Sequence, residues 1–240
     1  DTALVMTPTR ELATQVMQTM NNLIGRGNIR TALLIGGDSM QKQLKQMRRN
    51  PRLIVGTPGR TKDLIKRRKL SIDSIDRVIL DEADEMLSMG FKEDLESILS
   101  KTPKEKQTLL FSATMTKKVK EVTKGYMNNI KEISVARMNV ASENVKHVNY
   151  IVQARDRYEV IKRVSDMNPD IYGIVFCRTR RETKDVANKL MNDNYNADTL
   201  HGDLSQAQRD DVMNRFRKRQ IQILVATDVA ARGLDVNDLT

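Results

Sequence analysis

Short runs of Ile, Val and Leu alternate with longer amphipathic stretches along this chain of 240 residues. The first half contains six such runs: Ala3–Met6, Ala32–Ile35, Leu53–Val55, Val78–Leu80, Thr108–Phe111 and Ile133–Val135. Helical patterns separate them, for example at Glu11–Ile24 and Asp94–Leu99. Buried strands that alternate with helices form a parallel sheet covered on both faces. The sequence therefore predicts an α/β fold with parallel sheets flanked by helices.

The same rhythm starts again after a polar, non-periodic stretch at 138–146. The later runs predict strands at Val148–Val152, Ile174–Cys177, Ala197–Leu200 and Ile223–Ala226. The length suits two domains of about 120 residues each. We therefore predict one domain at 1–137, a linker at 138–146 and a second domain at 147–240. Both domains are expected to be truncated, because a buried strand begins almost at residue 1 and no closing element precedes residue 240.

The chain carries 41 Lys and Arg against 31 Asp and Glu, a net charge of +10. Residues 1–137 hold 25 basic and 16 acidic side chains, so the first half carries almost all of this charge. A protein this basic is expected to bind polyanions, first nucleic acid and second an anionic membrane surface.

Membrane-spanning and secreted proteins are excluded by what the sequence lacks. No apolar run approaches the roughly 18 to 20 residues that a spanning helix needs, and no leader pattern is present. The single cysteine, Cys177, cannot form an internal disulfide or build a Cys-based zinc site. A reducing compartment, the cytoplasm, is the expected location.

Acidic residues end the predicted strand before Asp81. Asp81 and Glu82 follow Val78–Leu80 directly, at the carboxyl edge of a parallel sheet, where such folds bind ligands. In nucleotide hydrolases a first acid holds Mg²⁺ and a second polarises the attacking water. The alternative is an ordinary acidic first turn of a helix.

Hydroxyl groups follow the next strand. Ser112 and Thr114 come after Thr108–Phe111, so they are expected at the same sheet edge, within reach of the carboxylates. Equally, Ser and Thr are common caps of a following helix.

Two segments of the first half share one design. Each of them, Pro8–Ala13 and Thr57–Arg60, follows a strand and opens a helix. Backbone N–H groups would then point outward, with an Arg beside them, as binding of a phosphate needs. The alternative is a Thr-capped helix started by Pro. Gly36 and Gly37 let a phosphate backbone approach closely or form a tight turn.

The second half repeats the placement of polar groups after strands. Arg178 follows Ile174–Cys177, His201 follows Ala197–Leu200, and Thr227 follows Ile223–Ala226. His201 has no nucleophile beside it in the pattern, which favours a structural or contact role over catalysis. Arg178 also fits a solvated helix start.

The order of these motifs resembles that of the DEAD-box ATP-dependent RNA helicases along essentially the whole chain. The matching elements are PTRELA, GG, TPGR, DEAD, SAT, FCRT, HGD followed by Q-x-x-R, and ATDVAARGLD. The resemblance implies two RecA-like domains that close on ATP and grip single-stranded RNA. ATP and Mg²⁺ are the implied cofactors.

The resemblance also implies site residues. Asp81 and Glu82 look like the acids that handle Mg²⁺, through water, and the attacking water. Asp84 with Ser112 and Thr114 would couple the ATP site to RNA. Residues of the second domain that would meet the nucleotide are Gly233 and Asp235.

RNA is the implied partner, held by its backbone with low sequence specificity, together with ribonucleoprotein or ribosome-assembly partners. The family's RNA-backbone motifs fall on Arg10, Gly37, Thr57, Gly59, Arg60, Arg178, Thr179, Gly202 and Thr227. Its Q-x-x-R element falls on Gln206 and Arg209. We hypothesise that the more basic first half makes the stronger ATP-independent contact with RNA.

The chain departs from the family in two respects. It contains neither G-x-x-x-x-G-K-[ST] nor H-R-x-G-R-x-G-R, which would stabilise the charge of the transferred phosphate. Negligible ATPase activity is therefore expected from these 240 residues alone. Two other functions stay open: an RNA clamp without useful turnover, and a DNA helicase or translocase.

Overall fold

The computed structural model describes all residues except 26, 135–144, 232–235 and 237. The chain divides into two compact units, Asp1–Asn139 and Val140–Thr240. The division falls among residues outside the described ranges, as does most of the predicted linker at 138–146. Among the residues that the structure describes, no helix is long and apolar enough to cross a membrane.

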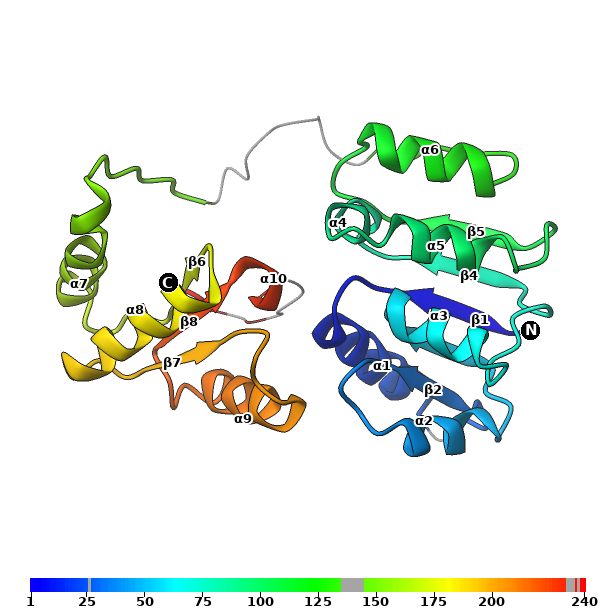
Figure 1. The fold of residues 1–240 in the computed structure, drawn as a ribbon, viewed down its shortest axis with the longest axis horizontal. Helices are drawn as coiled ribbons and strands as arrows, with labels where there is room; N and C mark the ends of the chain where they lie inside the picture. The colour runs from blue at the N-terminus through cyan, green and yellow to red at the C-terminus, as the bar shows by residue number, and fades with distance from the viewer. Residues whose placement is uncertain (26, 135–144, 232–235, 237) are drawn as a thin grey trace. The chain divides into compact units, whose positions relative to one another are not determined.

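The first unit alternates strands and helices, as the sequence predicts. Its elements are β1 (Ala3–Met6), α1 (Arg10–Ile24), β2 (Thr31–Leu34), α2 (Met40–Met47), β3 (Leu53–Gly56), α3 (Pro58–Lys66), β4 (Arg77–Leu80), α4 (Ala83–Ser88), α5 (Lys92–Leu99), β5 (Gln107–Leu110) and α6 (Lys117–Tyr126). The strands form one parallel sheet in the order β2-β3-β1-β4-β5, and their arrows run in one direction in Figure 1.

The strands of this sheet end level with one another. Met6 pairs with Gly56 on one side and with Leu80 on the other, while Gly56 also pairs with Leu34 and Leu80 with Leu110. We call this row of strand ends the carboxyl edge and the opposite row, where the strands begin, the amino edge. Every turn that follows a strand therefore leaves from one line.

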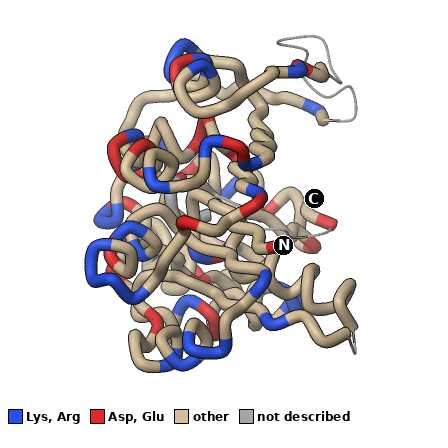
Figure 2. Tube along the Cα trace, turned by 90° about the vertical axis from the view of Figure 1, so that its right-hand side faces the viewer, with Lys and Arg blue, Asp and Glu red and all other residues tan. Residues whose placement is uncertain are grey.

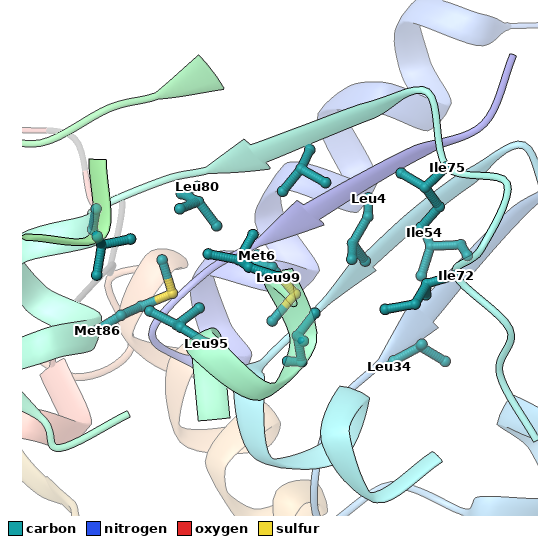
Figure 3. Packing of buried hydrophobic residues seen from close by; sticks show 14 of the residues in the cluster. Leu4, Met6, Leu34, Ile54, Ile72, Ile75, Leu80, Met86, Leu95 and Leu99 are labelled. Atoms are coloured by element: carbon teal, nitrogen blue, oxygen red, sulfur yellow. The ribbon is translucent and has the colours of Figure 1, made fainter. Parts of the chain in front are cut away.

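Two apolar clusters cover the two faces of the sheet. Successive side chains of a strand point to opposite faces, so Leu4 and Met6 pack on one face and Val5 on the other. Helices α4 and α5 add Met86, Leu95 and Leu99 to the first face, and Ile72 and Ile75 reach the same cluster from the loop before β4 (Figure 3). Burial from both sides explains why the strand sequences are continuously apolar.

The second unit contains a smaller parallel sheet in the order β6-β8-β7. Its elements are η1 (Ala154–Asp156), α7 (Arg157–Met167), β6 (Gly173–Cys177), α8 (Arg180–Asn192), β7 (Ala197–Leu200), α9 (Gln206–Arg217), β8 (Ile223–Thr227) and α10 (Asp228–Ala231). Cys177 pairs with Thr227, and Leu200 with Ala226, so these strands also end at one edge.

Two predicted strands are wrong or only partly described. The segment Val148–Val152 forms no strand, and its apolar side chains are exposed, with Ile151 at 95%. A strand needs a hydrogen-bonded neighbour, and no described strand of the second unit pairs with this segment. For the predicted strand at 133–135, Ile133 and Ser134 lie outside any strand and residue 135 is not described.

Candidate functional site

The acidic turn of the first unit leaves the carboxyl edge between β4 and α4. Asp81 N donates to Met6 O at 2.9 Å, so the turn begins against the end of β1. Glu82 N donates to Asp81 Oδ1 at 3.1 Å, and Glu82 adopts a left-handed backbone, with φ 51° and ψ 52°. A side-chain-bearing residue in this region stores strain of about 1–3 kcal/mol, a pattern that clusters at functional sites. The two adjacent acids are thus held in a fixed, strained turn.

Asp84 ties this acidic turn to the Ser112–Thr114 turn. Its Oδ2 accepts hydrogen bonds from Thr114 N at 2.9 Å and from Thr114 Oγ1 at 2.7 Å. Asp84 N donates in return to Ser112 Oγ at 3.3 Å, and Ser112 Oγ donates to Thr114 O at 2.8 Å. The predicted contact between a hydroxyl and a carboxylate is confirmed for Thr114 and Asp84, whereas the Ser112 hydroxyl contacts the backbone of Asp84. The turns after β4 and β5 therefore form one hydrogen-bonded unit.

Arg10, the first residue of α1, lies against Gly37 in the turn that follows β2. Gly37 has φ +80°, and a Cβ added to it would clash with Arg10 Nη1 and lie 3.1 Å from Arg10 Cζ. Gly36 has the same neighbour, at 3.4 Å from Arg10 Nη2. The absence of side chains in this glycine pair is what lets the guanidinium lie against the backbone.

The TPGR turn after β3 places Arg60 at the same edge. Thr57 is buried, and it precedes α3 without capping it through its side chain. Gly59 is exposed, and Arg60 Nη1 is buried with no hydrogen-bond partner among the described residues. A buried donor without a partner is costly, so Arg60 Nη1 is a donor with unused hydrogen-bonding capacity.

In the second unit, the turn after β6 is organised by a helix cap. Thr179 Oγ1 accepts from Glu182 N at 3.2 Å and thereby caps α8. The Glu182 carboxylate accepts from Arg178 N at 3.2 Å. Both Arg178 and Thr179 are exposed at the edge where the sequence places them.

The turn after β7 carries an ion cluster that the motifs themselves do not predict. Asp203, one residue after Gly202, pairs with Lys184 at 3.2 Å and with Arg180. Hydrogen bonds from Lys184 and Arg180 lower the pKa of Asp203. The sequence contains a signal for these ion pairs, because the carboxylate beside the turn glycine comes after a helix whose first turns hold Arg180 and Lys184.

His201 is structural, in agreement with the prediction. It is 3% exposed, and its Nδ1 accepts from Asp203 N at 3.2 Å. Burial lowers the pKa of His201, and the neighbouring Lys184 ammonium adds to the shift. The ring shapes the turn in its neutral form.

Arg209 of the Q-x-x-R element is buried, at 7% exposure. Its Nη1 donates to His201 O at 3.3 Å and its Nη2 to Ala230 O at 3.4 Å. At the start of α10, Thr227 Oγ1 accepts from Ala230 N at 3.3 Å. Gln206, the other residue of the element, donates through Nε2 to Asp210 Oδ1 within α9. Arg209 thus joins the turn after β7 to the helix after β8.

Three expectations concern the nucleotide and its metal ion. Gly233 and Asp235 lie outside the described residues. No group of three or more His, Cys, Asp or Glu side chains able to hold a metal ion occurs in the part of the chain that the structure describes. Asp81 offers a single carboxylate at a strand end, which fits Mg²⁺, an ion that keeps most of its waters and binds substrate phosphates.

Comparison with protein families gives two matches. Residues 1–122 match the DEAD/DEAH box helicase family, and residues 156–240 match the helicase conserved C-terminal domain. The first match covers half of the chain and includes the acidic turn and the Ser112–Thr114 turn. The chain belongs to the DEAD/DEAH box helicase family.

Individual relatives agree with this assignment. A probable ATP-dependent RNA helicase of Methanocaldococcus jannaschii is 43% identical over 237 residues, which cover 99% of this chain and 63% of that protein. The DEAD-box ATP-dependent RNA helicase CshA of Geobacillus kaustophilus is 41% identical over 99% of this chain and 51% of that protein. The chain therefore spans between half and two thirds of the length of these relatives.

Solved structures show the same fold. Dbp5 of S. cerevisiae bound to RNA and ADP BeF3 gives a TM-score of 0.88 at 27% identity, covering 100% of this chain and 61% of that chain. The DEAD-box helicase Mss116 bound to ssRNA and UDP-BeF gives 0.81 at 27% identity, covering 99% and 52%. The predicted α/β architecture of RecA-like domains is confirmed.

Proposed function

We propose that this chain is the core part of an ATP-dependent RNA helicase that remodels RNA through ATP-driven closure of two domains on a single strand. The observation that carries the proposal is the Asp84 carboxylate, which accepts two hydrogen bonds from Thr114. This contact gives the acidic turn a physical connection to its neighbour, which supports coupling between two ligand sites.

The position of Asp81 and Glu82 at the end of a strand supports a role in phosphoryl transfer. Asp81 would hold Mg²⁺ through water, and Glu82 would orient the attacking water. When bound, the ion neutralises charge on the phosphates. The strained turn keeps both carboxylates at the carboxyl edge without a reorganisation step.

RNA would be held by its backbone. Arg10, Gly37, Thr57, Gly59 and Arg60 supply cations, a hydroxyl and accessible backbone at one edge of the first unit. In the second unit, the same role falls to Arg178, Thr179, Gly202 and Thr227. Backbone contacts carry no base information, so low sequence specificity is expected. If ATP and RNA both favour domain closure, each must strengthen binding of the other.

The decisive experiment is a chimera in which these residues replace the matching segment of the Methanocaldococcus jannaschii relative. We expect RNA-stimulated ATP hydrolysis from the chimera and negligible hydrolysis from the 240-residue chain alone. E82Q should reduce the chimera's turnover by about 10²–10⁴, as loss of a positioned base does. E85Q is the matched control: this acid is one helical turn on, accepts from Ser88 Oγ at 2.8 Å, and should leave turnover unchanged.

The outcomes separate the competing functions. RNA binding without stimulated turnover would indicate an RNA clamp, and a preference for DNA strands under ATP would indicate a DNA translocase; either result overturns the proposal. The same proposal includes a cytoplasmic location, which the single buried Cys177 favours. It also includes ribonucleoprotein or ribosome-assembly partners.

A further inference from the structure

The positive charge of the protein is concentrated in one segment. Residues 39–72 hold eleven Lys and Arg and a single acid, Asp63, so this segment alone carries a charge of +10. That value equals the net charge of the whole chain. The segment runs through α2, β3 and α3, and every residue in it is described.

Most of these cations lie at the amino edge, at the opposite end of the sheet from the candidate site. Helix α2 ends at Met47 and α3 ends at Lys66, both where strands begin. The seven exposed cations that follow or flank these helix ends form what we call the basic rim: Arg48, Arg49, Arg52, Lys66, Arg67, Arg68 and Lys69. Figure 2 views the molecule from the side of residue 1, and stretches of Lys and Arg lie on the turns that face the viewer.

The protein itself satisfies few of these cations. Among the described residues, the basic rim has one ion pair, from Arg67 Nε to Asp63 Oδ1 at 2.7 Å. Arg52 Nε donates to Asp1 O at 3.0 Å. Gathering like charges without counter-charges destabilises the folded state by self-repulsion. An external polyanion would remove that repulsion.

The backbone of Arg68 adds independent evidence that the basic rim binds a ligand. Arg68 has φ 54°, the left-handed conformation that commonly follows a helix and that glycine adopts without strain. Arg219, after α9, has the same conformation, with φ 57°. Arg219, however, stacks on the Tyr172 ring at 4.8 Å and pairs with Asp238 at 3.4 Å, whereas no described side chain contacts Arg68 in this way.

We propose that the basic rim binds the phosphate backbone of duplex or folded RNA, without nucleotide, as a second RNA surface remote from the carboxyl edge. No Phe, Tyr, Trp or His occurs between residues 40 and 76, so the segment offers no aromatic ring of the kind on which single-stranded bases stack. No large apolar side chain in this segment is exposed, although a membrane-surface helix requires an apolar face. Phosphates on a helical backbone are therefore the anions that fit.

The proposal deepens the proposed function because it rests on RNA as partner, yet it requires neither ATP nor the candidate site. A strand that enters the carboxyl edge would come from RNA whose folded part is held elsewhere on the protein. Tethering both segments raises the effective concentration of one for its site.

The test measures binding of the 240-residue chain to a blunt RNA duplex of about 20 base pairs, without nucleotide, at several salt concentrations. The rim variant is R48Q/R49Q/K69Q. The control K101Q/K104Q/K124Q removes the same charge from exposed residues at the β5 end of the same edge, where Asn128 Nδ2 bonds Lys104 O at 2.9 Å. A third variant, R68G, removes one rim cation and relieves its backbone.

We expect the rim variant to lose at least about tenfold in affinity and to lower the salt slope by about 3, with the control nearly unchanged. R68G should melt at a higher temperature than the parent while binding the duplex more weakly. Equal losses in rim and control variants would mean non-specific charge attraction and would overturn the proposal. Binding of the rim to phosphatidylserine vesicles instead of the duplex would also overturn it, since the partner would then be a membrane.

If the rim variant binds the duplex as well as the parent does, the proposal for the rim is wrong but the chimera's ATPase activity is unaffected. If the chimera shows no RNA-stimulated ATP hydrolysis while the rim variant still loses duplex binding, only the helicase proposal is wrong. The two proposals are therefore tested separately.

Discussion

Both units tie together the turns that follow two neighbouring strands, but with opposite chemistry. In the first unit the Asp84 carboxylate accepts from Thr114, across the ends of β4 and β5. In the second unit the Arg209 guanidinium donates to His201 O and Ala230 O, across the ends of β7 and β8. The first tie is partly exposed and the second is buried.

This difference indicates different tasks. A buried guanidinium cannot leave its carbonyl acceptors without losing hydrogen bonds that water cannot replace inside the protein. A partly exposed carboxylate can exchange its partners for water at little cost. The second tie therefore fixes the shape of its turns, whereas the first is able to rearrange when ligands bind.

The largest expected effect comes from breaking the buried tie. R209M should destabilise the second unit by about 2–4 kcal/mol, because it removes a buried charged donor and its hydrogen bonds to His201 O and Ala230 O. Hydrogen exchange at β7 and β8 measures this loss. R217M, an exposed arginine on the same helix, should change stability by less than about 0.5 kcal/mol. Equal effects of the two variants would remove the distinction between the ties.

A glycine substitution tests a further contact of the first unit, between Arg10 and Gly37. G37A should cost about 1–2 kcal/mol, since alanine resists a positive φ and its Cβ would displace Arg10. The matched control is G90A, where φ is +88° but nothing lies within 4 Å of the added Cβ. Urea unfolding of both variants isolates the contact, and a cost at Gly37 no greater than at Gly90 contradicts it.

The exposed tie should be cheaper to break. T114V removes one hydroxyl donor to Asp84 and should cost about 1 kcal/mol in the first unit. T114S keeps the hydroxyl and should restore most of that stability in the same unfolding measurement. A loss as large as that of R209M would show that the first tie is as rigid as the second.

The smallest effect is expected at the ion cluster around Asp203. D203N should lower the melting temperature less than T114V does, and 1 M salt should abolish the difference. Because the pKa of Asp203 is lowered in the folded state, its contribution is present above its usual pKa and is lost as the pH falls through the folded value. D185N, at the exposed Arg181–Asp185 pair of α8, the helix that also holds Arg180 and Lys184, serves as the control; a salt-independent loss would contradict the surface assignment.

Much of this arrangement could be predicted from the sequence because parallel strands bring their ends together. The alternation of apolar runs located eight strands to within one or two residues, and the approach of Ser112 and Thr114 to an acidic turn followed from strand order alone. The predicted role of each site residue in catalysis and RNA binding stays a prediction.

Other features could not be predicted because they depend on tertiary packing. Arg209 lies in a polar helix start, and nothing local indicates that its side chain is buried, since arginine is rarely found inside proteins. The apolar Val148–Val152 segment has the composition of a strand, yet pairing depends on a neighbour that local sequence cannot specify. Concentration of charge at 39–72 is visible in the sequence, but its position at the amino edge is not.

The strands of the first sheet all end at the carboxyl edge, so their lengths fix where the turns of the site begin. A residue added inside any one strand would lift the following turn by about 3.3 Å, which exceeds the tolerance of the hydrogen bonds between turns. A substitution within a turn, by contrast, leaves the position of the strand ends unchanged. Insertions and deletions during the evolution of this protein should therefore spare the strands, whose lengths set the position of the turns that follow them.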